Sequence, residues 1–469
     1  MLSKLFRPQK PQRTSDRDQA VVPYDGPVDL LIDGATLVTV NECDEIIADG
    51  AIAIADGAIV AIGAAADLKT LRARADIVVD AHGKIVMPGL INTHCHGGDS
   101  LFRGLVEGLA LEPWLEKLWV AESGTLDPAR TRLGSTLGYG ENLLCGVTTV
   151  MDMFWYPENL VAAADETGIR VATGPLFFDP PGIDGHQSTE REALAKAFFD
   201  QFADHPSLIK TVCAHGAYTV SAESLTVAQM IQDDNDALLT IHAAETRAEQ
   251  KTVMDHYGRS VINHLDELGL LSARTVLAHC VHVDEEEIDL LAASRATVSH
   301  NPASNLKLGS GIAPIPAMRD KGVHIGLGTD GAVSGNDLDM WKSIRLAAIL
   351  HNGATENPVA MGAGEVIRMA TINGALALGV ADETGSLEVG KRADIILMDP
   401  RQAHAVPVFN PLNYLAYSAS HQDVCDVYVA GRQVVKDRVL TTVDLASVTS
   451  DVNALIPTIE ATLTQAKTS

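Results

Sequence analysis

Two histidines separated by one residue, His94 and His96, follow an apolar run and precede two glycines in the stretch MPGLINTHCHGGD. Side chains alternate between the two faces of a β-strand, so we expect His94 and His96 on one face and Cys95 on the other. Two imidazoles on one face can share a metal ion. They can also be ordinary polar residues at a strand end, and the rest of the chain must decide between these interpretations.

Two other stretches carry the remaining ligand types that such a site needs. LLTIHAAET contains His242, followed three residues later by Glu245, and GLGTDGA contains Asp330. Three imidazoles and one carboxylate suit Zn²⁺ or Fe²⁺ with one position left open for water. We therefore predict one divalent ion per subunit, with Zn²⁺ as the expected ion and Fe²⁺ as the alternative, held by His94, His96, His242 and Asp330.

Further polar residues stand at the ends of expected strands. Glu245 is either a general acid or base beside the metal or a carboxylate favoured at a helix start. His279, in VLAHCVHV, is either a second base or a core histidine. His215 is interpreted as a substrate contact or outer ligand, and His300 as a loop-shaping residue or a substrate contact. The predicted catalytic residues are Glu245, His279 and Asp330.

The elements that must position these residues are eight short apolar runs separated by longer amphipathic stretches. They are LINTHCHG, GVTTVMDMFW, RVATGPLFF, LIKTVCAHGAY, LLTIHAAET, TVLAHCVHV, ATVSHNPASN and VHIGLGTDG. Strands that alternate with helices form parallel sheets, so the pattern predicts an α/β fold with a (β/α)₈ TIM barrel. A doubly wound open sheet is the competing topology, but no GxGxxG follows a strand. The polar residues stand at the C-terminal edge of the runs, where barrel active sites are built.

Two segments with short strands and glycine turns flank these runs. One extends from VDLLIDGATLVTV to DIVVDAHGKIVMPG, and the other contains GSLEVGKRADIILMDP and VCDVYVAGRQVVKDRVL. We expect residues 21–87 and 385–445 to pair into one discontinuous β-sandwich domain beside a barrel formed by residues 88–384. Residues 1–20 are expected to be a polar tail, and residues 446–469 a helical segment.

Composition and charge exclude several classes of function. A formal charge of −26 argues against nucleic-acid binding, which needs clustered Lys and Arg. No apolar run reaches the roughly 18 residues of a membrane span. The six cysteines show no CxxC spacing and are interpreted as reduced thiols. We expect a cytoplasmic protein with a small-molecule substrate and no nucleic-acid or membrane partner, and a homo-oligomer (dimer or tetramer).

With these residues assembled, the chain resembles the amidohydrolase superfamily, in its cytosine deaminase-like and chlorohydrolase branch, and is most similar to the methylthioadenosine/S-adenosylhomocysteine deaminases. The resemblance rests on several long motifs: MPGLINTHCH, RGLVEGLALEPWL, GVTTVMDM, HAAET, LAHCVH, VSHNPASNLKLGSGIAPI and GLGTDGAVSGNDLDMW. It implies one metal on the four ligands already proposed and proton transfer by Glu245 and His279. It also implies that His215 contacts substrate and that Glu122 binds the sugar of a nucleoside.

The chain departs from this family at two places that bear on the substrate. Gly97, Gly98 and Asp99 replace a bulkier stretch, and Pro175 stands where the nucleoside deaminases carry an arginine. The surrounding loops offer aromatic and acidic residues instead, which suit a flat, neutral or cationic, amino-bearing molecule, although the rings can equally pack between loops. The predicted substrate contacts are His215, Glu122, Asp99, Trp155 and Phe178.

The expected activity is hydrolytic deamination of an amidine-like C–NH₂ group in a nitrogen heterocycle or nucleoside-like molecule, by a metal-activated hydroxide, with release of ammonia. Hydrolysis of another C–N bond or of a C–Cl bond (in a triazine, urea, guanidine or amide) is the alternative, and a non-catalytic metal-binding relative is a third. Lys210 precedes His215 by five residues and is expected on the opposite face of its strand, which favours one metal over two.

Overall fold

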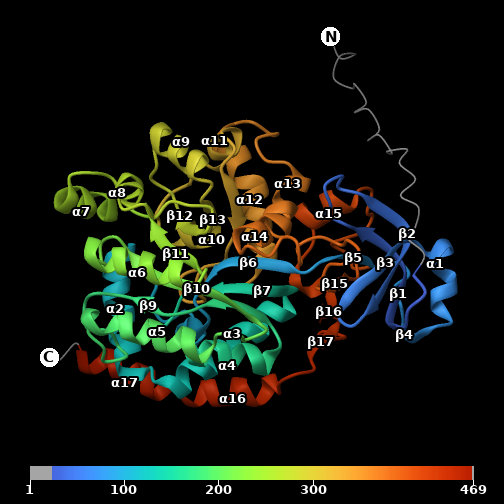
Figure 1. Cartoon of the computed structure of the whole chain (residues 1–469), viewed down its shortest axis with the longest axis horizontal. Coiled ribbons are helices and arrows are strands. Elements are labelled where there is room, and N and C mark those ends of the chain that lie inside the picture. Colours follow the sequence, from blue (N-terminus) through green and yellow to red (C-terminus); the bar gives the residue numbers. More distant parts are fainter. Residues whose placement is uncertain (1–23, 467–469) are drawn as a thin grey trace, which may run out of the picture.

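The computed structural model describes residues 24–466, so the predicted tail of residues 1–20 lies outside the described part. Figure 1 shows a large α/β body and, at one side of it, a second sheet built from both ends of the chain. All six cysteines are free thiols, and four of them are buried. Among the described residues, no helix has the length and apolar character needed to cross a membrane.

The predicted (β/α)₈ barrel is confirmed. Its strands run parallel in the order β14-β13-β12-β11-β10-β8-β7-β6, and the short β9 (Leu176–Phe177) pairs with β10. Each of the eight apolar runs supplies one of these strands: β6 (Leu90–Cys95), β7 (Val147–Asp152), β8 (Arg170–Thr173), β10 (Leu208–Gly216), β11 (Leu238–Ala243), β12 (Thr275–His279), β13 (Thr297–His300) and β14 (His324–Leu327). Their carboxyl ends therefore meet at one rim.

The first and last strands of the barrel meet through a few specific hydrogen bonds instead of a ladder. The backbone N–H groups of Thr329 and Asp330 donate to the carbonyl of His94, at 3.2 and 3.0 Å. The Thr93 hydroxyl donates to the carbonyl of Leu327 at 2.9 Å, and Asn92 exchanges hydrogen bonds with Thr329. The segment that closes the barrel is thus also the segment that carries two candidate ligands.

Helices cover the barrel, and several begin at a residue whose side chain satisfies a free backbone N–H. Ser221, Thr246 and Asp284 cap α6, α7 and α9 in this way, just after barrel strands, and Ser260 caps α8, which follows α7. The helices are α1 (Ala65–Arg72), α2 (Leu111–Thr125), α3 (Pro128–Leu144), α4 (Pro157–Thr167), α5 (Arg191–Gln201), α6 (Ala222–Asp234), α7 (Arg247–Tyr257), α8 (Val261–Glu267), α9 (Glu285–Ser294), α10 (Pro302–Lys307), α11 (Ile315–Asp320), α12 (Met340–Ala354), α13 (Ala363–Met369), α14 (Ile372–Ala377), α15 (Pro411–Tyr417), α16 (Leu445–Ala454) and α17 (Ile456–Ala466).

The two flanking segments form one sheet, as their shared strand pattern predicts. The sheet order is β18-β17-β16-β15-β5-β1-β2-β3, with β4 also paired to β1. Ile32 and Ile54 of one half pack in the same buried cluster as Leu397 and Tyr428 of the other, so apolar faces of the two halves share a core. The strands are β1 (Val28–Val38), β2 (Ile46–Ala55), β3 (Ala58–Ala64), β4 (Ala75–Asp80), β5 (Ile85–Pro88), β15 (Ile395–Met398), β16 (Val424–Val429), β17 (Arg432–Lys436) and β18 (Val439–Leu440).

A buried ion pair joins the barrel to this sheet. Arg170, at the start of β8, donates through Nη1 to Asp394 Oδ2 at 2.5 Å, and the two side chains are 7% and 0% exposed. Asp394 also accepts from the Thr384 hydroxyl and from the Ala430 N–H, at 2.8 and 2.7 Å. This carboxylate therefore ties together three segments that are distant in sequence.

We expect Asp394→Ala to destabilise the protein by about 3–5 kcal/mol, because the Arg170 charge stays buried without a partner. The measurement is urea unfolding followed by circular dichroism. Asp255→Ala is the matched control, since it removes only an exposed pair with Lys251 and should change stability by less than about 1 kcal/mol. Equal effects of the two substitutions would contradict the role assigned to the buried pair.

Candidate metal centre and active site

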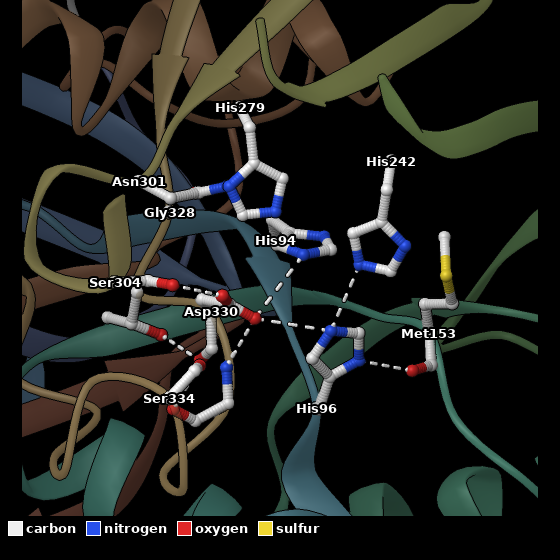
Figure 2. A network of polar contacts seen from close by, with 12 residues as sticks. His94, His96, Met153, His242, His279, Asn301, Ser304, Gly328, Asp330 and Ser334 are labelled. Carbon is white, nitrogen blue, oxygen red and sulfur yellow. Dashed lines mark hydrogen bonds and ion pairs between the residues drawn. The ribbon is translucent and has the colours of Figure 1, made fainter. Parts of the chain in front are cut away.

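The four predicted ligands meet at the C-terminal rim of the barrel (Figure 2). His94 lies at the end of β6 and His96 just after it, His242 lies on β11, and Asp330 follows β14. Asp330 Oδ1 is 3.2 Å from His96 Nε2 and 3.5 Å from His94 Nε2. His242 Nε2 lies 3.3 Å from His96 Nε2. Residues far apart in sequence are thus brought together with their nitrogen and oxygen atoms facing one point.

Outer hydrogen bonds turn the rings toward this point. Nδ1–H of His96 donates to the carbonyl of Met153 at 2.5 Å, and Nδ1–H of His242 donates to the carbonyl of His215 at 2.6 Å. The proton on Nδ1 leaves the Nε2 lone pair free on each ring, as metal-ligating histidines require. Asp330 is held in turn by the Ser304 hydroxyl, at 2.5 Å from Oδ2.

The spacing of these atoms fits a divalent metal ion. Two ligand atoms placed about 2.0–2.1 Å from a tetrahedral ion are about 3.3–3.5 Å apart, which matches the 3.2, 3.5 and 3.3 Å observed. Both ring nitrogens of His94 are buried without a hydrogen-bond partner in the described structure. Burial lowers the pKa of His94 to about 4, so its ring is neutral. Residues 94, 96, 242 and 330 therefore form a donor set that Zn²⁺ or Fe²⁺ would satisfy.

Glu245 and His279 stand next to this donor set. Glu245 Oε2 lies 3.7 Å from His279 Nε2, and Glu245 Oε1 accepts from the Ser310 hydroxyl at 3.1 Å. Nδ1 of His279 is paired with Asn305 Oδ1 at 2.8 Å, which leaves Nε2 facing the site. Burial raises the pKa of Glu245, a shift that favours a carboxyl able to carry a proton near neutral pH. His279 also lies within ligand reach of His94 and His242.

A cavity opens above the candidate ligands. Its floor is formed by three of the candidate ligands (His96, His242 and Asp330) together with Glu245 and His279. One wall is the inner face of α2, with residues Leu111, Trp114, Leu115, Leu118 and Trp119. This wall comes from the long connection between β6 and β7. It gives the cavity the apolar, aromatic lining that is typical of small-molecule sites.

Of the predicted substrate contacts, Asp99, Glu122, Trp155 and His215 line the cavity. Phe178 does not belong to its lining among the described residues. It packs edge-on against Trp155 and His215, with ring centroids 5.4 and 5.3 Å away, and so supports the wall from behind.

Asp99 and Glu122 approach each other from different elements, the 3₁₀ turn Gly97–Phe102 and α2. The two carboxyl groups are near enough for each to shift the pKa of the other, and burial raises the pKa of both, that of Asp99 to about 7. The two glycines before Asp99 are required by packing. A Cβ on Gly98 would lie 2.2 Å from the Phe154 ring, and one on Gly97 would lie 2.6 Å from Asp152.

The loop after the third barrel strand carries Pro175 at the position where the nucleoside deaminases carry an arginine. Pro175 lies between β8 and β9, and its carbonyl accepts the Cys213 N–H at 2.9 Å. Arg191, from the start of α5, reaches back toward the site, but its guanidinium is bonded to Asp184 and sits 5.9 Å from the Trp155 ring. Arg191 thus braces a cavity wall without lining the cavity.

Two further residues from the sequence lie apart from the cavity lining. Nε2 of His300 lies 3.2 Å from Nε2 of His351 on α12, so His300 faces the helical layer. Lys210 lies on β10, in the portion that pairs with β8, below the rim. Residues that the sequence reasoning missed include Trp119, Tyr218, Ser304, Asn305 and Ser310. The last three belong to the SHNPASNLKLGSG stretch, whose polar content is the signal that could have found them.

Comparison with known proteins agrees with this arrangement. The model of the amidohydrolase family matches residues 85–434. A 5-methylthioadenosine/S-adenosylhomocysteine deaminase of Syntrophobacter fumaroxidans is 37% identical over 432 residues, which cover 92% of this chain and 98% of the relative.

Two solved structures share the fold over nearly their whole length. An adenosine deaminase from Xanthomonas campestris with bound zinc has a TM-score of 0.90 and 33% identity, and the match covers 93% of this chain and 99% of that one. An atrazine chlorohydrolase from Arthrobacter aurescens complexed with zinc has a TM-score of 0.85 and 26% identity, covering 91% and 100%. On the family match and the similarity to these relatives, the chain belongs to the amidohydrolase family.

Proposed function

We propose that the protein is a metal-dependent aminohydrolase that removes an amino group from the ring of an adenine-type nucleoside or a similar nitrogen heterocycle. The observation that carries the proposal is the convergence of His94, His96, His242 and Asp330, with Glu245 and His279 beside them. Zn²⁺ is the proposed ion, in keeping with the zinc named in two structural neighbours. Such an ion would supply the Lewis acidity that turns a water into a nucleophile near neutral pH.

The chain's own residues would move the protons. His279, fixed through Nδ1 by Asn305, presents Nε2 as an acceptor toward the floor of the cavity. Glu245, whose pKa is raised by burial, would donate a proton to the ring nitrogen beside the attacked carbon. The same carboxyl would then carry a proton to the departing ammonia. Ser310 holds one oxygen of Glu245, which leaves the other free for this transfer.

The cavity supports the choice of substrate class. Its walls of tryptophan, phenylalanine and leucine side chains suit a flat heterocycle. Relatives named as deaminases of adenine nucleosides match most of the chain, which favours loss of ammonia over loss of chloride. Hydrolysis of a C–Cl bond is the second candidate, because the chlorohydrolase shares the fold at 26% identity.

The test is release of ammonia or chloride from a substrate panel by zinc-loaded protein. The panel contains 5′-deoxyadenosine, methylthioadenosine, free purines, a pterin, amino- and chlorotriazines and a guanidine. We expect ammonia from at least one adenine nucleoside, loss of activity after chelation, and recovery with Zn²⁺ or Fe²⁺. Metal-replete protein that releases chloride only, or no ammonia from any of these compounds, would contradict the proposal.

A further inference from the structure

The buried acids in the cavity, Asp99 and Glu122, take no part in the proton transfers of the proposed deamination. Asp99 is 4% exposed and Glu122 is 3% exposed, and both line the cavity. Two carboxylates that share one buried cavity wall repel each other unless a proton or a cation lies with them. Such a pair is costly to keep inside an apolar pocket, so its presence needs a reason.

One oxygen of the pair is unsatisfied. Asp99 Oδ1 is buried without a hydrogen-bond partner in the described structure. Asp99 Oδ2 packs against the backbone of Gly331, where a Cβ would approach it to 2.4 Å. A buried acceptor without a donor, on a residue that lines a cavity, is the mark of a position that a ligand completes.

The surroundings of the pair decide which ligand fits. Among the described residues, the cavity lining contains the carboxyl groups of Asp99, Glu122, Glu245 and Asp330 and no lysine or arginine. The nearby guanidinium, that of Arg191, is neutralised by Asp184 outside the lining. The other neighbours are aromatic rings, with Phe154 packed beside Gly98 and Trp155 beside Glu122. Acidic groups set among aromatic faces attract organic cations and repel carboxylates.

We propose that Asp99 and Glu122 form a cation subsite that takes a compact ammonium, amidinium or guanidinium group of the substrate, next to the metal centre. The inference rests on the proposed function for the identity of the cavity as the substrate site. It assigns to Asp99 a role in specificity, since Asp99 provides the unsatisfied oxygen and follows the two glycines that make room for the turn. Substrates with an anionic side chain would be excluded from this end of the cavity.

The experiment is calorimetric titration of zinc-loaded protein with benzamidine, its neutral isostere benzamide, and benzoate. Benzamidine should bind at least about tenfold more tightly than benzamide, because a hydrogen bond to a charged group adds that much, and benzoate should bind more weakly than both. Asp99→Asn and Glu122→Gln should each reduce the preference for benzamidine over benzamide by about tenfold. The control, Asp200→Asn on the exposed face of α5, should keep the wild-type preference.

Equal affinities for benzamidine and benzamide, or a preference that both variants retain, would overturn the proposal. If Asp99→Asn loses its near-ultraviolet circular dichroism or its metal, Glu122→Gln carries the test alone. Because the titration reads binding without turnover, a protein that releases no ammonia from any substrate would refute the proposed function while leaving the result for the subsite standing. An active deaminase that shows no preference for benzamidine would refute the cation subsite and leave the proposed function standing.

Discussion

Glu245→Gln is expected to keep a full complement of bound metal while kcat falls by about 10³-fold, within the range that general acid–base groups contribute. Glutamine preserves the hydrogen bond from Ser310 to the side-chain oxygen but cannot take up and deliver a proton. The proposed metal ligands His94, His96, His242 and Asp330 stay untouched. Ammonia release under saturating substrate and elemental analysis of the same sample measure the two quantities together.

The matched control for this change is Glu112→Gln. Glu112 is exposed at the start of α2, where it accepts a hydrogen bond from Thr246, so the same chemical change is made outside the cavity. Its activity should stay within about twofold of the unmodified protein, as for most exposed substitutions. A metal-replete Glu245→Gln protein with near-normal kcat would remove Glu245 from the mechanism.

His242→Ala is expected to lower the affinity for the metal by at least about 100-fold, more than the loss of an outer partner of a ligand costs. After dialysis the protein should hold less than about one-tenth of an ion per chain, and activity should fall in proportion. The reason is geometric, since His242 supplies one of the facing Nε2 atoms, 3.3 Å from that of His96. Elemental analysis against protein concentration gives the stoichiometry.

His256→Ala is the control for His242→Ala, because it removes an imidazole that is not one of the proposed ligands. His256 is exposed on α7 and bonded only to the carbonyl of Thr252, so its removal should leave the metal content unchanged. Unchanged stoichiometry in His242→Ala as well would show that the ion is held elsewhere.

The barrel and the donor set could be predicted from sequence because both follow from local pattern. Nearly every apolar run carries a polar residue at its C-terminal edge, and parallel strands bring those ends to one rim. This pattern already joined residues that lie more than 200 positions apart, such as His94 and Asp330, and the family resemblance implied the same set. Side chains alternate in direction along a strand, so neighbouring residues at the rim have different partners. Asn301 lies 3.4 Å from His279, whereas His300 contacts His351 in the helical layer.

The residues that escaped prediction act through contacts that residue type does not encode. His215 was predicted as a substrate contact or outer ligand, but its backbone carbonyl, which accepts from His242, makes a contact that any residue can make. Trp119 enters the cavity because α2 folds over the rim, and the periodicity of that helix alone does not say what its apolar face covers. Arg191 reaches Trp155 from a helix in the next layer. These positions depend on how loops and helices pack in three dimensions.

The way in which the barrel closes has a consequence for the order of folding. The carbonyl of His94, on the first strand, receives the N–H groups of Thr329 and Asp330, which follow the last strand. Chains are synthesised from the N-terminus onward, at about 5–20 residues per second. The first strand is therefore made well before its partners, which follow the rest of the barrel. The donor set can thus be complete only after the eighth strand has docked. Capture of the ion then reports that the barrel is finished, and a chain truncated before β14 has no way to acquire activity.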